Sequence, residues 1–317
     1  MKILIKNIAE IHSPFLEVKK DQFILIKDQL IKKIDKMSKL DQSEQYDQVI
    51  DAADKIVLPG FINTHTHAAM TLMRGYADDM PLDKWLQNKI WPFEGRIDAE
   101  DIYWGTALAV MEMIKTGTTT FSDMYFSMEK VADVVEESGI RAVLAVGLIE
   151  ANDGQKGLNK ALKYALDYNG AADGRITTML APHAPYTCSR DYLEQIKELA
   201  LENNIPVHIH LSESKKEVND FLNSYQSSPI KYLADFDFFD NHVLAAHCVH
   251  LEPGDLEILR ENRVQIAHNP MSNAKLANGI APIKQYLNNE LNVSLGTDGV
   301  SSNNSLDMLK EAKMASY

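Results

Sequence analysis

Two histidines separated by one residue, His65 and His67, follow a Pro-Gly turn and a short apolar run that begins at Phe61. Alternate side chains of a β-strand share a face, so these imidazoles point the same way, about 7 Å apart along the backbone. At that spacing both can bind one metal ion. An isolated His-x-His pair is more often a chance occurrence, so its meaning depends on the rest of the chain.

Further histidines and acids stand where later apolar runs end. They are His183 in APHAPY, His208, His210 and Glu213 in VHIHLSE, His247 and His250 in AAHCVH, His268 in HNPMSN, and Asp298 in GTDG. Their recurrence at successive strand ends is hard to attribute to chance. Three imidazoles and a carboxylate can bind one borderline-soft divalent ion, and the other groups are available for proton transfer.

The elements that must position these groups are predicted strands at 61–67, 118–124, 141–149, 176–183, 206–212, 243–249, 264–268 and 293–297, and predicted helices at 99–116, 127–138, 158–168, 190–203, 214–224 and 253–262. Eight strands alternating with helices favour parallel pairing, and eight strands close a TIM-like (β/α)8 barrel. Functional groups of such barrels lie at the C-terminal ends of the strands. A doubly wound sheet is disfavoured because no Gly-x-Gly-x-x-Gly follows the first strand.

Residues 1–57 lack the alternation of strands and helices seen in the barrel segment 58–317. They predict a small β layer, with strand candidates near 3–8 and at 15–18, 23–26 and 55–58. The chain stops at Tyr317 within a helical stretch that follows the eighth strand, and the β layer has no evident second half. We therefore expect C-terminal sequence to be missing.

Composition excludes several classes of protein. The chain carries 45 acidic and 32 basic residues, a net charge of −13, without a Lys/Arg-rich tract, which argues against a nucleic-acid polymer as partner. The N-terminus does not resemble a signal peptide, and no apolar run reaches the ~18 residues of a membrane span. Two cysteines make no disulfide framework, so we expect a cytoplasmic protein. A homo-oligomer is left open.

The connection between the first two barrel strands is about fifty residues, far longer than usual. It contains Trp85, Trp91 and Glu94. Two tryptophans in a long loop at the catalytic end suggest a lid or pocket wall, and packing in the core is an equal alternative. His208 lies deeper than His210 and is interpreted as a core histidine or a support for a ligand. His268 fits either a supporting or a merely polar role.

The segments PGFINTHTH, VHIHLSE, AAHCVHL, HNPMSNAKLANG and GTDGVSSNNSLDM together resemble the amidohydrolase superfamily, and most closely its 5-methylthioadenosine/S-adenosylhomocysteine deaminase family. The resemblance covers about residue 55 to the end. It implies a β-sandwich built from both chain ends, of which 1–57 would be an incomplete part. It also implies one metal ion, usually zinc with iron and manganese as alternatives, and assigns the following residues. The metal ligands are His65, His67, His210 and Asp298; Glu213, His247 and Asp298 are catalytic; Glu94, His183, Trp85, Glu213 and Asp298 contact substrate.

The implied reaction is hydrolytic deamination of an adenine nucleoside derivative such as 5′-methylthioadenosine, S-adenosylhomocysteine or adenosine. A bound divalent ion lowers the pKa of water from ~15.7 towards ~7, and Asp298 can accept the proton. Glu213 can protonate a ring nitrogen, and His247 can orient the attacking group. A chlorohydrolase, a guanine or cytosine deaminase, and a catalytically silent assembly protein are the alternatives.

One position departs from the family pattern. Members that act on adenosine derivatives commonly carry an arginine near the end of the third strand, where this chain has Val146, and Lys156 is the only nearby cation. This favours substrates without a carboxylate tail. No lysine stands at the third or fourth strand end, so a carboxylated-lysine bridge between two metals is not expected.

Overall fold

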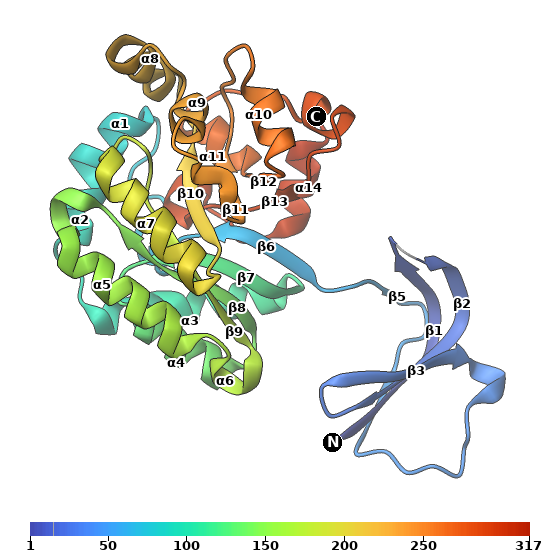
Figure 1. Cartoon of the computed structure of the whole chain (residues 1–317). Helices are drawn as coiled ribbons and strands as arrows, with labels where there is room; N and C mark the ends of the chain where they lie inside the picture. The colour runs from blue at the N-terminus through green and yellow to red at the C-terminus, as the bar shows by residue number, and fades with distance from the viewer. Residues whose placement is uncertain (15) are drawn as a thin grey trace. The chain divides into compact units, whose positions relative to one another are not determined.

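The computed structural model describes residues 1–14 and 16–317. The chain divides into two compact units, Met1–Gly60 and Phe61–Tyr317, whereas the sequence predicted a division after residue 57 (Figure 1). Phe15, which was predicted to begin a strand, lies outside the described residues.

The first unit is a five-stranded sheet in the order β3-β2-β1-β4, with β5 also paired to β1. Its strands are β1 (Lys2–Ser13), β2 (Leu16–Lys27), β3 (Leu30–Lys36), β4 (Gln48–Asp51) and β5 (Ile56–Val57). The predicted strands 15–18 and 23–26 are not separate, because the polar segment between them stays paired, with Lys19 opposite Ile11 and Lys20 opposite Glu10. β3 and β4 were not predicted.

The second unit contains eight parallel strands hydrogen-bonded in chain order. They are β6 (Phe61–Thr66), β7 (Thr118–Tyr125), β8 (Arg141–Leu148), β9 (Ile176–Pro182), β10 (Val207–Leu211), β11 (Val243–His247), β12 (Gln265–His268) and β13 (Val293–Leu295). The first and last strands meet, because the Asp298 amide donates to the His65 carbonyl at 2.9 Å and Thr64 Oγ1 donates to the Leu295 carbonyl at 2.9 Å. The (β/α)8 barrel is therefore confirmed.

Helices lie outside the strands (Figure 1). They are α3 (Ala99–Lys115), α4 (Met128–Ser138), α5 (Glu150–Tyr168), α6 (Ala171–Gly174), α7 (Arg190–Asn203), α8 (Lys215–Tyr225), α9 (Pro229–Ala234), α10 (Asp255–Glu261), α11 (Pro270–Lys275), α12 (Ile283–Asn288), α13 (Val300–Asn303) and α14 (Met308–Ala315). Apolar residues at helical spacing turn inward, as Val131, Val134 and Val135 do in α4. Helix α5 begins eight residues before its predicted start, and Gly154 at φ +50° interrupts it.

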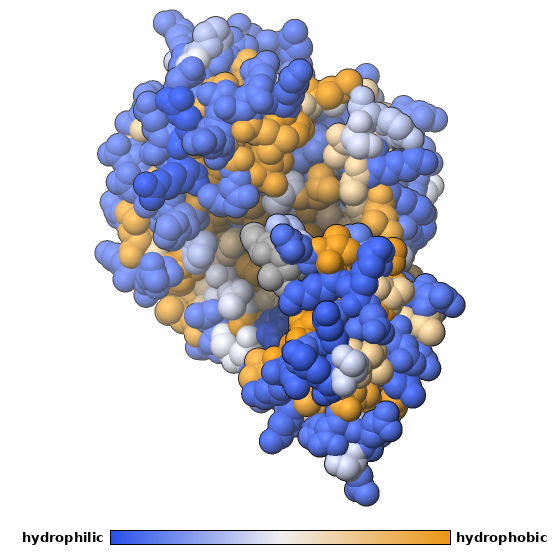
Figure 2. Space-filling view, turned by 90° about the vertical axis from the view of Figure 1, so that its right-hand side faces the viewer, coloured by the Kyte–Doolittle hydropathy of each residue, from blue (hydrophilic) through white to orange (hydrophobic). Residues whose placement is uncertain are grey.

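The long connection between β6 and β7 is largely helical rather than an open loop. It contains η2 (Ala68–Met73), α1 (Leu82–Trp85), the π-helical η3 (Leu86–Ile90) and α2 (Trp91–Glu94) before α3 begins. Ile90 is fully buried and Trp85 is 4% exposed, so this segment packs on the barrel as a wall. Among the described residues no helix is both long and apolar enough to cross a bilayer. The surface seen in Figure 2 is largely hydrophilic, with separate apolar groups.

Candidate metal centre and active site

Three histidines at the ends of β6 and β10 present the same ring nitrogen to one point. The Nδ1 atoms have these partners: His67 Nδ1 contacts the Met124 carbonyl at 2.6 Å, His210 Nδ1 the His183 carbonyl at 2.7 Å, and His65 Nδ1 lies 2.9 Å from His208 Nε2. A ring that donates from Nδ1 to a carbonyl keeps its Nε2 lone pair for a metal. The predicted support role of His208 agrees with its contact to His65.

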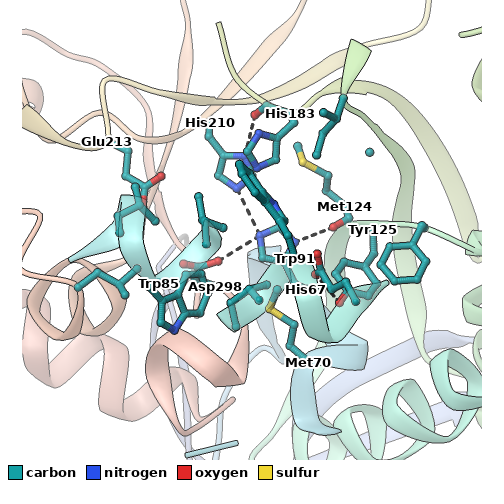
Figure 3. A pocket seen from close by; sticks show the side chains of 18 of the residues that line it. His67, Met70, Trp85, Trp91, Met124, Tyr125, His183, His210, Glu213 and Asp298 are labelled. Atoms are coloured by element: carbon teal, nitrogen blue, oxygen red, sulfur yellow. Dashed lines mark hydrogen bonds and ion pairs between the residues drawn. The ribbon is translucent and has the colours of Figure 1, made fainter. Parts of the chain in front are cut away.

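Asp298 completes a compact set of donor atoms. Its Oδ1 lies 3.2 Å from His67 Nε2 and 3.4 Å from His65 Nε2, and His210 Nε2 lies 3.3 Å from His67 Nε2 (Figure 3). Ligands bound at 2.0–2.2 Å in a tetrahedron are separated by roughly 3.4 Å. These separations therefore fit one divalent ion, with imidazole nitrogen and carboxylate oxygen as the ligand types.

His247 lies beside this set. Its ligand atom falls within 4.8 Å of those of His65, His210 and Asp298, but its Nε2 is 4.0 Å from Asp298 Oδ2 and 3.8 Å from Glu213 Oε1. Those distances exceed the 3.2–3.4 Å that separate Asp298 from His65 and His67. His247 is thus placed to reach a group bound next to the ion.

The electrostatics of the set favour a cation. Burial by itself would raise the pKa of Asp298, but hydrogen bonds from His65 and His67 hold it well below its usual value. Burial lowers the pKa of His65 to about 4, which keeps that imidazole neutral. Burial also acts to lower the pKa of His67, but the contact with Asp298 outweighs it and raises the value to about 9. A bound cation would take the place of that proton.

Glu213 stands at the same cavity, three residues beyond His210. It is buried, which raises the pKa of its carboxyl, and Asn278 Nδ2 donates to its Oε1 at 2.8 Å. A carboxyl with a raised pKa keeps its proton to a higher pH than a free glutamate does and can deliver it to a substrate.

A cavity of about 570 Å³ is lined by His67, His210, Glu213, His247 and Asp298, and its other walls are mostly apolar. Trp85, Leu86, Ile90 and Trp91 line it from the long connection (Figure 3). Trp85 is therefore both buried and part of the pocket wall. The two alternatives from the sequence, a pocket wall and packing in the core, are both correct for this residue. Among the described residues that line this cavity there is no lysine or arginine.

Two further polar side chains, besides the candidate metal ligands, line the cavity. Tyr125 Oη donates to Glu94 Oε1 at 2.6 Å, and burial raises the pKa of Glu94. His183 lies beside His210, with ring centroids 4.8 Å apart, and burial lowers its pKa to about 3. Both line the cavity, and the substrate contacts that the resemblance assigns to them stay a prediction. Val146 does not line the cavity; Gly147 and Ile149 do.

The chain matches the amidohydrolase family model over residues 56–317. It is 52% identical over 320 residues to a 5-methylthioadenosine/S-adenosylhomocysteine deaminase of Halothermothrix orenii, covering 100% of this chain and 74% of that protein. It is also 52% identical to a 5′-deoxyadenosine deaminase of Methanococcoides burtonii, over 84% of this chain and 62% of that protein. The chain belongs to the amidohydrolase family.

A solved adenosine deaminase of Xanthomonas campestris with bound zinc has the same fold as this amidohydrolase. The TM-score is 0.91 at 32% identity, with 99% of this chain and 72% of that one covered. A guanine deaminase of C. acetobutylicum, at 23% identity and a TM-score of 0.88, shares the fold.

Several residues at or next to this amidohydrolase site have left-handed backbone conformation, which the sequence did not predict. Ser212 (φ +49°), His247 (φ +75°) and Asp298 (φ +60°) each occupy this region where a strand ends. Non-glycine residues rarely adopt it, and such strain is concentrated at functional sites. The motifs containing these residues were recognised, but their residue types gave no signal of the unusual backbone.

Other sequence candidates lie outside the centre. His268 lines a second cavity with Pro270 and Ile283, and burial lowers its pKa to about 4. His250 Nε2 contacts the Asn278 carbonyl at 2.6 Å and is structural. Burial raises the pKa of the Cys248 thiol, so Cys248 is not suited to act as a nucleophile beside His247.

Proposed function

We propose that this amidohydrolase is a metal-dependent deaminase that removes the exocyclic amino group of an adenine nucleoside as ammonia. The observation that carries the proposal is a set of donor atoms next to a buried carboxyl. The donor atoms are 3.2–3.4 Å apart on His65, His67, His210 and Asp298, and the carboxyl is that of Glu213. Glu213 lines one cavity with all of these ligand candidates except the fully buried His65. The names of the two 52% identical relatives support the same activity.

His65, His67, His210 and Asp298 would hold one divalent ion, which we infer to be zinc, with iron and manganese as alternatives. When bound, such an ion acidifies water and makes it a nucleophile at neutral pH. We also infer a reducing, cytoplasmic setting, since Cys188 and Cys248 are both free thiols.

The chain's own residues would then move the protons. Asp298 takes a proton from the attacking water at its carboxylate, and His247 Nε2 orients that water. Glu213 delivers a proton to the ring nitrogen next to the amino-bearing carbon, which makes that carbon electrophilic. The water oxygen bonds to the carbon, the amino group takes the proton held by Asp298, and the carbon–nitrogen bond breaks to release ammonia. The proton left on the former water oxygen returns to Glu213 as the carbonyl of the product forms.

The remaining cavity residues would bind the nucleoside. Glu94 would accept hydrogen bonds from the ribose hydroxyls, and His183 and Trp85 would contact the base or sugar. Because no cation lines the cavity among the described residues, an uncharged 5′ substituent fits its apolar wall better than a carboxylate does. We therefore propose methylthioadenosine, 5′-deoxyadenosine or adenosine ahead of S-adenosylhomocysteine.

Ammonia release by the purified, metal-analysed protein tests the proposal, with these three nucleosides, S-adenosylhomocysteine, guanine and cytosine as substrates. We expect about one metal ion per chain and the highest kcat/KM with an uncharged 5′ group. His210→Ala should lose metal and activity, and His242→Ala, at an exposed position, should keep both. No ammonia from any substrate with metal bound would refute the deaminase, and chloride release from a chlorotriazine would select a chlorohydrolase instead.

A further inference from the structure

Helix α11 and the turn that follows it bring one asparagine each, Asn273 and Asn278, to the two groups that would orient the water and deliver the proton. Asn273 Oδ1 lies 2.8 Å from His247 Nδ1, and Asn278 Nδ2 donates to Glu213 Oε1 at 2.8 Å. Both asparagines are buried. A backbone hydrogen bond from the Asn278 amide to the Asn273 carbonyl, at 2.8 Å, links them directly.

The contact of Asn273 determines the tautomer of His247. An amide oxygen has only lone pairs to offer, so at 2.8 Å from Nδ1 it requires the imidazole hydrogen to be on Nδ1. The Nδ2 atom of Asn269 is also near Nδ1, but at 3.4 Å it is at the limit of a hydrogen bond. With the hydrogen on Nδ1, the Nε2 lone pair of His247 is free, and Nε2 has no hydrogen-bond partner among the described residues.

The turn that carries Asn278 is itself rigidly placed. Ala277 (φ +54°) and Gly279 (φ +113°) flank it in left-handed backbone, and a Cβ on Gly279 would lie 3.3 Å from Val249 Cγ1. The Asn278 carbonyl accepts from His250 Nε2 at 2.6 Å. The Asn278 side chain therefore has few alternatives to the bond with Glu213.

We propose that Asn273 and Asn278 are positioning residues that act as one unit, Asn273 by fixing His247 with its Nε2 lone pair toward the cavity and Asn278 by holding Glu213 Oε1 beside it. This rests on the proposed function. The 3.8 Å between His247 Nε2 and Glu213 Oε1 places both groups around one substrate position. A substrate there would receive the water oriented by His247 at its amino-bearing carbon and the proton of Glu213 at the adjacent ring nitrogen.

The first test compares Asn273→Leu, Asn273→Asp and Asn278→Leu with wild type, using an adenine nucleoside that wild type deaminates. Loss of a support for a catalytic group costs ~10–100-fold. We expect that loss in kcat for both leucine variants, with KM within twofold and metal content unchanged. Asn273→Asp keeps an acceptor oxygen and should recover part of the loss. Asn288→Leu, at an exposed position of α12, is the control.

The second test does not depend on a variant that might misfold. In ¹⁵N-histidine-labelled wild type, nitrogen shifts report the tautomer of each ring, and His247 is assigned by the signal lost in His247→Gln. We expect the hydrogen on Nδ1. A hydrogen on Nε2, or leucine variants with unchanged kcat, would overturn the inference while wild-type ammonia release still upholds the function. Absence of ammonia from wild type would instead refute the function.

Discussion

The floor and the wall of the cavity are built in different ways. The floor is the set His65, His67, His210 and Asp298, which projects from strand ends of a closed barrel; His65 is fully buried and the other three line the cavity. The wall, Trp85, Leu86, Ile90 and Trp91, comes from helical turns inserted between β6 and β7. Each floor histidine has its ring fixed by a partner at 2.6–2.9 Å, whereas the wall offers mainly apolar surface.

This difference separates chemistry from substrate choice. Parallel strands fix the position of their last residues by a continuous hydrogen-bond ladder, so the floor tolerates little change. The wall packs by side-chain contact, which permits variation in shape without loss of the metal. Substitutions in the floor should therefore abolish the reaction, and substitutions in the wall should mainly alter binding.

The largest effect is expected in the floor. Asp298→Asn removes a charged ligand and the group proposed to accept a proton from water. We expect the bound metal to be lost and kcat/KM to fall ~10³-fold or more. Metal analysis and ammonia release measure the two effects. Asp240→Asn, an exposed aspartate, should match wild type, and an active, metal-loaded Asp298→Asn variant would remove the distinction between floor and wall.

A smaller loss is expected where the floor meets the substrate. Glu213 is outside the four proposed ligands, so Glu213→Gln should keep the metal while kcat falls ~10²–10³-fold through loss of the proton donor. The measurements are metal content and kcat with a single nucleoside. Glu257→Gln changes an exposed glutamate and should have no effect. Loss of metal in Glu213→Gln would show that its carboxylate belongs to the floor.

The floor candidates could be brought together from the sequence because strand periodicity and the barrel rule act on single residues, whereas the family resemblance selected His210 from the other strand-end histidines. His65 and His67 must share a face, and Asp298 must lie at the same end of the barrel as both. The wall could not be derived in the same way. Trp85 and Trp91 were expected in a loop, and nothing in their spacing specified the π-helical turn that separates them. The sequence did not predict that Asn273 and Asn278 support His247 and Glu213, because the position of a buried amide depends on tertiary contacts rather than on a repeating pattern.

The wall itself is tested by Trp85→Phe. Trp85 is 4% exposed and lines the cavity, so the smaller ring of phenylalanine would remove apolar surface that a bound nucleoside contacts. Losing the contact of one CH₂-sized group costs about 0.8 kcal/mol, which corresponds to a rise in KM of about fourfold. We expect kcat within twofold and full metal content.

Trp104→Phe is the matched control, because Trp104 is 61% exposed on α3. A fall in kcat of Trp85→Phe that exceeds the change in KM would mean that the wall takes part in chemistry.

The smallest effect on activity is expected for a residue that supports the floor from outside the cavity. Glu311 of α14 is 1% exposed and accepts a hydrogen bond from Asn303, whose Nδ2 also donates to the Thr297 carbonyl next to Asp298. Burial raises the pKa of Glu311 from 4.5 to about 7. The folded state therefore binds a proton that the unfolded chain has lost, so stability is greatest below pH 4.5 and falls as the pH rises towards 7. The loss is at most about 3 kcal/mol.

Glu311→Gln cannot ionise, so its melting temperature relative to wild type should rise by several degrees between pH 5 and pH 8, measured by circular dichroism, while kcat stays within twofold. Glu261→Gln, at an exposed position, should show no such trend. The contrast is sharp because Asp298 and Glu311 are both buried acids near Thr297, yet only one faces the cavity. A large loss of kcat in Glu311→Gln would mean that the carboxylate of Glu311 helps to place Asp298. The floor would then extend beyond the strand ends.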